Sequence, residues 1–162
     1  GCAVLVEAIK AVKQSPNELV YVFSVQEEVG LRGSRTAAYS VEPDIAIAVD
    51  TTLTGDTPKS SPFAIRLGAG PAIKVMDSSV IAHPMVKELM IRRAEEAGIA
   101  YQLEVLTAGG TDSGAIHLSR AGVPSGVLSI PTRYVHSPHE MVDSGDLKHC
   151  VELLTKILEN GI

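Results

Sequence analysis

Two adjacent glutamates, Glu27 and Glu28, stand one residue after a continuous run of β-branched and aromatic residues at 19–25. Such a run is typical of a strand that is buried on both faces, so the pair stands where a predicted strand ends. Two carboxylates this close repel each other unless a cation neutralises them. Where the chain leaves the extended conformation, the two side chains can take different tasks. One glutamate could bind a metal ion while the other serves as a general base.

Asp50 and His136 offer further metal-ligating atoms. Asp50 ends a second apolar run at 44–50, and His136 lies in the polar loop after the run at 123–130. Glutamate, aspartate and histidine together suit zinc, cobalt or manganese, whereas calcium prefers oxygen ligands alone. Read singly, each residue is more simply a solvated surface or turn residue, and His139 in the same loop is a rival ligand. From the pattern alone, a metal-hydrolase site and a set of unrelated surface residues both remain open.

A glycine-rich segment follows a third predicted strand at 101–106. Gly109 and Gly110 lack a Cβ, so their backbone could approach a ligand closely. The segment lacks the spacing of a phosphate-binding loop, which makes nucleotide binding a weak interpretation. We expect Gly109, Gly110, Thr111 and Arg133 to contribute to substrate binding. For Arg133, an ordinary surface charge is the competing interpretation.

The elements that must position these residues alternate along the chain. Apolar periodicity and turn residues predict helices over 2–14, 33–39, 84–97, 112–121 and 146–158, the last capped by Asp146, and strands over 19–25, 44–50, 101–106 and 123–130. This alternation predicts an α/β domain with a largely parallel sheet and helices on both faces. In such sheets functional residues gather at the carboxyl ends of the strands, which is where the candidates above stand.

Length and composition exclude several classes of protein. A chain of 162 residues is the size of one domain. The net charge of −5 and the lack of a basic stripe argue against a nucleic-acid partner, and no apolar run reaches the length of a membrane span. Cys2 and Cys150 stand at opposite ends of the chain and form no zinc or disulfide motif. We therefore expect reduced core cysteines and a cytoplasmic location.

Several short motifs, in order along the chain, resemble those of one known family. They occupy residues 25–34, 48–52 with 55–58, 67–71, 108–113 and 130–137. Together they resemble the tetrahedral (TET) aminopeptidases, also called glutamyl or deblocking aminopeptidases, some members of which carry an endoglucanase or cellulase label. The resemblance covers essentially the whole chain, and even the first five residues match the start of a helix in that family.

The resemblance implies a three-layer α/β/α zinc-peptidase-like fold and a dinuclear metal centre that removes N-terminal residues from peptides. Carried over position by position, it makes Glu28 and His136 ligands of one metal, Asp50 a ligand of the other, and Glu27 the general base. The implied cofactors are two divalent ions, zinc or cobalt, with manganese as a further option. The implied partners are peptide substrates and further copies of the chain in a dodecamer.

The sequence departs from the family in its missing beginning. The family's upstream histidine, its metal-bridging aspartate and an inserted β-rich oligomerisation domain have no counterpart in residues 1–162. The chain is therefore expected to be the C-terminal portion of a catalytic domain that binds metal weakly by itself. It could be the ordered part of a longer enzyme, one of two separate chains, or a truncated and inactive scaffold. Adjacent carboxylates cannot flank a sugar bond from both sides, which disfavours glycosidase activity.

Overall fold

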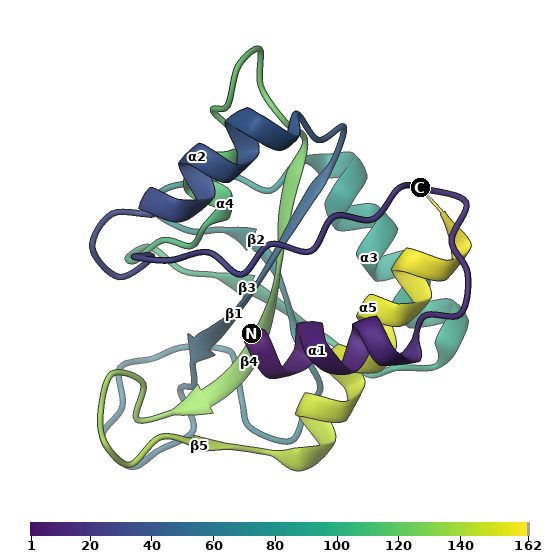
Figure 1. Ribbon diagram of the computed structural model, residues 1–162. Coiled ribbons are helices and arrows are strands. Elements are labelled where there is room, and N and C mark those ends of the chain that lie inside the picture. Colours follow the sequence, from purple (N-terminus) through teal and green to yellow (C-terminus); the bar gives the residue numbers. More distant parts are fainter. Residues whose placement is uncertain (162) are drawn as a thin grey trace.

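A computed structural model describes residues 1–161 as a five-stranded sheet with helices on both faces (Figure 1). The elements in chain order are α1 (Cys2–Ala11), α2 (Arg32–Val41), β1 (Ala46–Leu53), β2 (Ala72–Met76), α3 (Pro84–Ala97), β3 (Gln102–Val105), α4 (Ser113–Ile116), β4 (Ser125–Arg133), β5 (Met141–Val142) and α5 (Ser144–Asn160). The expected α/β class, with a central sheet flanked by helices, is confirmed.

The sheet is mixed, so the expectation of a largely parallel sheet is wrong. The strand order is β1-β4-β2-β3, with β5 on the far end of β4. Strands β1 and β4 are parallel, as are β2 and β3, whereas β2 and β5 both run antiparallel to β4. Apolar runs reveal that a strand is buried on both faces, but they carry no information about its direction.

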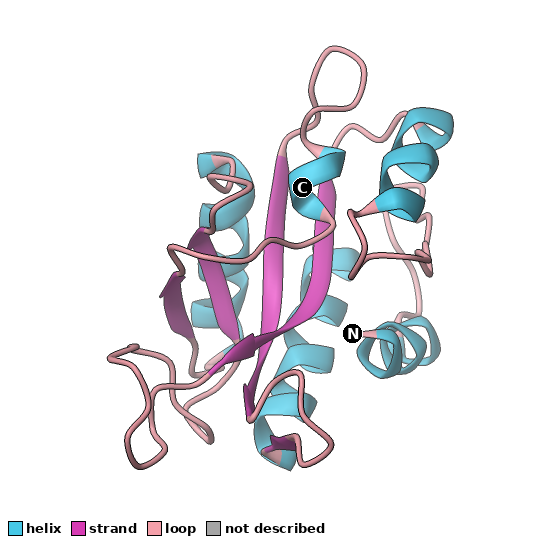
Figure 2. Cartoon of the chain, turned by 90° about the vertical axis from the view of Figure 1, so that its left-hand side faces the viewer, coloured by secondary structure: helices cyan, strands magenta, loops and turns pink. Residues whose placement is uncertain are grey.

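The helices form two layers, one on each face of the sheet. Helices α1, α3 and α5 pack on one face, and α2 and α4 cover the other (Figures 1 and 2). Buried residues of α1, α3, α5, β2 and β4 form the main apolar core, including Val4, Met90, Leu128 and Leu153. The face beneath α4 is different, because it also buries charged side chains of β2 and β3.

Local signals explain where the longer helices begin and end. Proline at the first position of α3 and a left-handed Gly98 after its last residue fix its two ends. The cap of α5 is Asp143, whose carboxylate accepts the backbone N–H groups of Gly145 and Asp146. The prediction that Asp146 caps this helix is therefore wrong. Its buried carboxylate instead accepts two backbone N–H groups from residues 68 and 70 of a distant loop.

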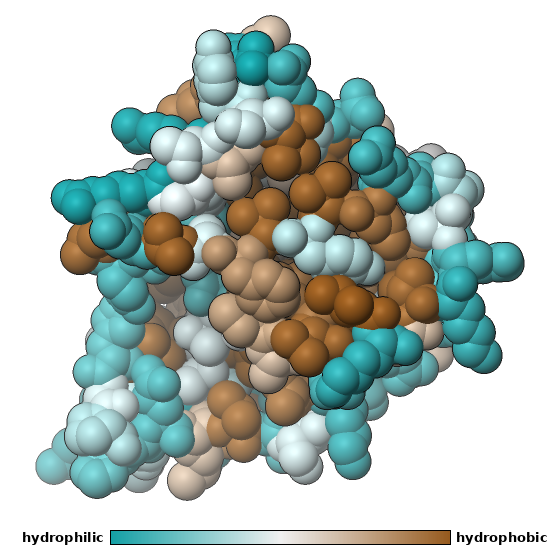
Figure 3. Space-filling view, viewed as in Figure 1, coloured by the Kyte–Doolittle hydropathy of each residue, from teal (hydrophilic) through white to brown (hydrophobic). Residues whose placement is uncertain are grey.

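The predicted strand at 19–25 does not form. The segment runs extended across the front of the molecule, but among the described residues no backbone hydrogen bond pairs it with β1. Val20, Val22, Phe23 and Val25 remain 41–67% exposed and contribute to the broad apolar area of this face (Figure 3). A strand is stabilised by its neighbours, and β1 pairs only with β4 in residues 1–161. The apolar run is a strand-forming sequence without a partner strand.

Two further boundaries differ from expectation. The predicted helix at 112–121 shortens to Ser113–Ile116, because the chain then turns through a left-handed Arg120 and Gly122. The predicted loop at 131–145 is partly strand, since β4 continues to Arg133 and pairs with β5. None of the helices in residues 1–161 combines the length and apolar character that crossing a membrane requires.

Candidate metal centre and active site

The acidic loop at 26–31 is fixed by backbone hydrogen bonds to the start of α2. Gln26 and Leu31 both adopt left-handed φ angles, of 59° and 54°. The carbonyl of Glu27 accepts the N–H groups of Gly30 and Leu31, and the carbonyl of Val25 accepts that of residue 33 at 2.9 Å. The loop therefore holds Glu27 on a turn of defined shape.

Gly33 permits this close approach between the loop and α2. A Cβ at position 33 would lie 2.5 Å from the backbone nitrogen of Val25 and 2.6 Å from its oxygen. Backbone atoms cannot yield as the end of a flexible side chain can, so only glycine fits. The first turn of α2 thereby sets the place at which the acidic pair leaves the extended segment.

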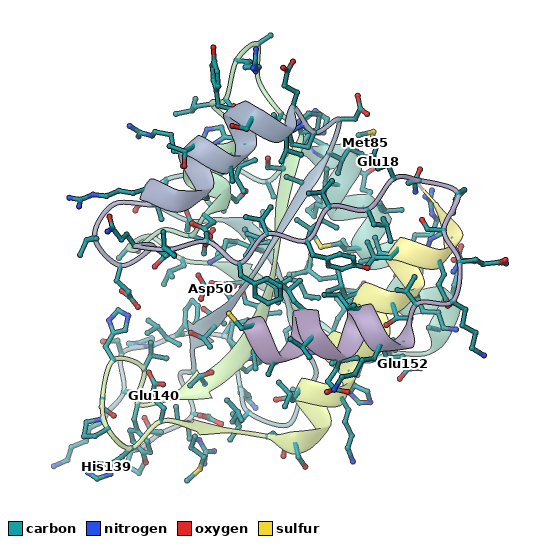
Figure 4. All side chains as sticks on the ribbon, in the orientation of Figure 1. Glu18, Asp50, Met85, His139, Glu140 and Glu152 are labelled. Carbon is teal, nitrogen blue, oxygen red and sulfur yellow. The ribbon has the colours of Figure 1, made fainter. Side chains whose placement is uncertain are left out.

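Glu28 and His136 lie together, as the resemblance implies for ligands of one metal. The Nε2 atom of His136 is 3.3 Å from Oε1 of Glu28, and both side chains are 73% exposed. The backbone N–H of His136 donates to Glu140 Oε1 at 2.7 Å, which fixes the loop that carries the imidazole. His139, the rival ligand, is exposed and points away from Asp50 at the outer rim of this loop (Figure 4).

Glu27 is the acidic side chain whose ionisation is most perturbed in this region. Burial, and then the charges of Asp50, Glu28 and Asp112, together raise the pKa of Glu27 to about 7, against a lowering by His136. A carboxyl group with a pKa near neutrality can both accept and release a proton under ordinary conditions. Its environment is therefore suited to a general base.

Asp50 lies within β1 rather than at its end. Strand β1 continues to Leu53, so the strand ends three residues after Asp50 and not at Asp50 as the sequence suggests. Burial is the main cause that raises the pKa of Asp50, and the N–H of Thr51, which donates to Oδ1 at 2.7 Å, lowers it. The charges of Asp112 and Glu28 raise it again. Acidic groups from three separate segments thus share one negatively charged region.

This region fits divalent cations in charge and donor chemistry, but its ligands are not gathered. Among residues 1–161, no three histidine, cysteine, aspartate or glutamate side chains lie close enough to hold a metal ion. Glu28 and His136 are exposed side chains of loops, whereas Asp50 lies on a strand of the sheet. An uncompensated group of carboxylates favours binding of a cation. The residues supply part of a coordination sphere.

The glycine-rich loop has less freedom than its sequence suggests. Gly109 has a φ of 72° and is exposed, but a Cβ at Gly110 would lie 2.9 Å from Oγ of Ser79. Thr111 is buried, and its hydroxyl has no hydrogen-bond partner within residues 1–161. Gly109 and Gly110 are both exposed, but only at Gly109 does the surrounding space leave room for a side chain.

Arg133 is engaged in an ion pair. Its Nε and Nη2 atoms donate to the two carboxylate oxygens of Asp56, at 3.0 and 2.8 Å. This two-point geometry satisfies the carboxylate and holds the pKa of Asp56 well below its usual range. A guanidinium held in this way does not present a free positive charge to a substrate.

Asp112 is a site residue that the sequence reasoning missed. It precedes α4, its charge raises the pKa values of both Glu27 and Asp50, and it accepts a hydrogen bond from the hydroxyl of Ser24. Its position directly after the glycine-rich segment was the available signal, because it too follows a strand. The acidic region therefore receives residues from four parts of the chain.

Comparison with known proteins supports one family. A putative aminopeptidase from Acetivibrio thermocellus is 57% identical over 98% of this chain and 48% of its own length. An aminopeptidase from Desulfurococcus kamchatkensis is 42% identical with a TM-score of 0.95, over 99% of this chain and 46% of that one. The Pyrococcus horikoshii TET1 peptidase, which assembles into a tetrahedron or a large octahedral shell, is 32% identical with a TM-score of 0.84, over 97% and 46%.

The chain spans about half the length of these relatives. The family model described as M42 glutamyl aminopeptidase matches residues 1–153, which is almost the whole chain. The chain therefore belongs to the M42 glutamyl aminopeptidase family.

Proposed function

We propose that this chain supplies one half of the active site of a metal-dependent aminopeptidase, with Glu27 as the general base. The observation that carries the proposal is one acidic region in which Glu28 and His136 lie 3.3 Å apart and the charges of Asp50 and Glu28 act on Glu27. The Glu28–His136 pair beside it provides the types of ligand that hydrolytic metals bind. Family membership supports the reaction class.

The proposed metal ligands are Glu28 and His136 for one cation and Asp50 for a second, either zinc or cobalt, with manganese as the third option. When bound, two such cations supply Lewis acidity toward a carbonyl oxygen and a water of lowered pKa. Positive charge at this place would also offset the repulsion among the carboxylates that raises the pKa values of Glu27 and Asp50.

In the proposed reaction, Glu27 removes a proton from the water that attacks the scissile carbonyl. The same carboxyl group then gives the proton to the leaving amine, which leaves Glu27 ready for another cycle. Gly109, Gly110 and Thr111 remain proposed substrate-binding positions. Arg133 would take part only together with Asp56, because the ion pair occupies its guanidinium.

We further propose that residues 1–162 form the C-terminal portion of the catalytic domain. The relatives are about twice as long, which leaves room for additional ligands and an oligomerisation domain outside this chain. The TET1 peptidase assembles into large shells, and we extend homo-oligomer formation to the complete enzyme. A metal-free scaffold is the second candidate function, favoured by the absence of a converged three-residue ligand set in residues 1–161.

A hybrid protein tests the proposal. In the Acetivibrio thermocellus relative, the segment that matches this chain is replaced by this chain, and hydrolysis of aminoacyl-p-nitroanilides is measured with added zinc or cobalt. Glu27→Gln should lower kcat by at least about 100-fold at unchanged metal content. The matched control is Glu7→Gln, since Glu7 is an exposed residue of α1. Near-normal turnover of Glu27→Gln would rule out the proposed role of Glu27.

Zinc titration of the isolated chain separates the two candidate functions. The scaffold alternative is supported if the chain binds no zinc at micromolar concentration and the hybrid has no activity. An active hybrid excludes it.

A further inference from the structure

We infer that Asp112 is a positioning residue for Glu27, and that it acts through its hydrogen bond with Ser24. The inference deepens the proposed function and rests on it, because it concerns the same general base. Ser24 lies three residues before Glu27, and its hydroxyl donates to Oδ2 of Asp112, 88 residues further along the chain. This is a tertiary contact between the acidic loop and the start of α4.

Asp112 is held firmly enough to serve as an anchor. Its backbone carbonyl accepts the N–H groups of residues 115 and 116, both at 3.0 Å. Glycines bring the surrounding turn against its neighbour: a Cβ at Gly114 would lie 2.3 Å from Oγ of Ser79, and one at Gly110 would lie 2.9 Å from the same atom. The first turn of α4 therefore has little space in which to shift.

A second contact joins the same two segments on the other side of Glu27. The Cδ1 atom of Leu31 would lie 3.4 Å from a Cβ at Gly114, so the loop after Glu27 packs on α4. The contact of Ser24 with Asp112 thus holds the chain before Glu27, and the contact of Leu31 with Gly114 holds it after Glu27. Glu27 lies on the short span between two points of attachment.

The span needs such attachment because its own backbone is strained. Gln26 and Leu31 are non-glycine residues with positive φ, a conformation that costs free energy and persists only where surrounding contacts impose it. The preceding segment 19–25 gains no support from strand pairing within the described residues. Loss of the Ser24–Asp112 contact should therefore let residues 24–27 relax.

The second carboxylate oxygen of Asp112 supports a role beyond holding the fold. Oδ1 is buried and has no hydrogen-bond partner within residues 1–161. A buried acceptor without a hydrogen bond lowers stability, so the stability of the fold alone does not explain a carboxylate at this position. A general base must reach its proton within hydrogen-bonding distance, and a displacement of about 1 Å can cost about 100-fold in rate.

The kinetic test uses the hybrid enzyme. Ser24→Ala and Asp112→Ala should each lower kcat by about 10- to 100-fold, with KM and metal content unchanged. The double variant should be no slower than the slower single variant, because both changes remove one contact. Ser24→Thr, which restores the hydroxyl, should recover most of the rate.

The matched control is Ser15→Ala. The Ser15 hydroxyl also makes a partly buried contact between distant parts of the chain, at the carbonyl of Leu158, but it involves none of the proposed site residues. Its removal should leave kcat within about twofold of the unsubstituted hybrid. Equal losses in Ser24→Ala and Ser15→Ala, or a Thr variant as slow as the Ala variant, would overturn the inference.

Amide hydrogen exchange on the isolated chain gives an independent test that needs no activity. The N–H groups of Gly30, Leu31, Arg32 and Gly33 donate to carbonyls of residues 25–27 and report on the span. Ser24→Ala should accelerate their exchange by about tenfold, whereas Ser15→Ala should not. Unchanged exchange would overturn the positioning role. An inactive unsubstituted hybrid would instead refute the proposed function and leave exchange to decide the role of the contact.

Discussion

Lys74 is the fully buried cation of a charged cluster on the face of the sheet beneath α4. Its ammonium lies 2.5 Å from Oε1 of Glu104 and 3.7 Å from Oδ2 of Asp77, with all three side chains at most 2% exposed. The hydroxyl of Thr52 donates to the same Glu104 oxygen at 2.7 Å. The cluster joins β1, β2 and β3, so we expect Lys74→Met to be strongly destabilising.

The expected loss of unfolding free energy in Lys74→Met depends on the hydrogen bonds that Asp77 and Glu104 retain without the ammonium. Oδ1 of Asp77 retains three hydrogen bonds, two from Ser79 and one from Val80. Glu104 would retain only the Thr52 hydroxyl, and its Oε2 has no partner among residues 1–161. Removing one member of a buried ion pair typically costs about 3–5 kcal/mol. We expect a loss in that range, because Glu104 would remain buried without its cation.

Urea unfolding at pH 7, analysed by linear extrapolation, measures the loss. Lys10→Met is the matched control, because Lys10 pairs with Glu7 where both side chains are more than half exposed. This variant should lose less than about 1 kcal/mol of unfolding free energy. Adding Glu104→Leu to Lys74→Met should restore at least about 1 kcal/mol, since it removes the unpaired carboxylate. A Lys74→Met loss equal to that of the control, or a less stable double variant, would refute the reasoning.

Two further predictions concern acid stability and the unpaired segment. The folded pKa of Asp56 is lowered, chiefly by its hydrogen bonds to Arg133, so the pair contributes stability above pH 4 that is lost as pH falls below that value. Asp56→Asn should reduce the fall in unfolding free energy that is measured as the pH is lowered from 5 to 2. An unchanged pH dependence in this variant would count against a stabilising role of the pair. The amides of residues 20–25 should exchange rapidly in the isolated chain and become protected in the hybrid. Protection already present in the isolated chain would mean that the segment is paired there.

Much of the fold could be predicted because buried strands and helix ends leave recognisable patterns of residue types in the sequence. The apolar runs near β1, β3 and β4 mark strands, and the proline and glycine at the ends of α3 mark its limits. The run at 19–25 shows where this reasoning stops. Its residues favour a strand, but strand formation also requires a neighbour, and a sequence pattern does not reveal whether the neighbour is present. Strand β2 was not among the predicted strands, and nothing in the sequence pattern indicates that it runs antiparallel to β4.

The candidate site was predictable to the extent that function gathers at strand ends. Glu28 and His136 are 108 residues apart, yet Oε1 of Glu28 and Nε2 of His136 lie 3.3 Å apart, because the loop after β4 reaches the loop after the extended segment 19–25. The pairing of Arg133 with Asp56 could not be predicted, because charge complementarity alone does not select one partner among many acidic residues. Asp112 was missed because a single aspartate after a glycine-rich turn is equally typical of a helix start.

The most direct test of the central claim is the pattern of peptide cleavage by the hybrid enzyme. A peptide with a free N-terminus and its N-acetylated counterpart are incubated with the hybrid and zinc or cobalt, and the products are identified by mass spectrometry. We predict stepwise release of N-terminal residues from the free peptide, no cleavage of the acetylated one, and loss of all cleavage in Glu27→Gln. Equal cleavage of both peptides, or stepwise release that survives Glu27→Gln, would contradict the account.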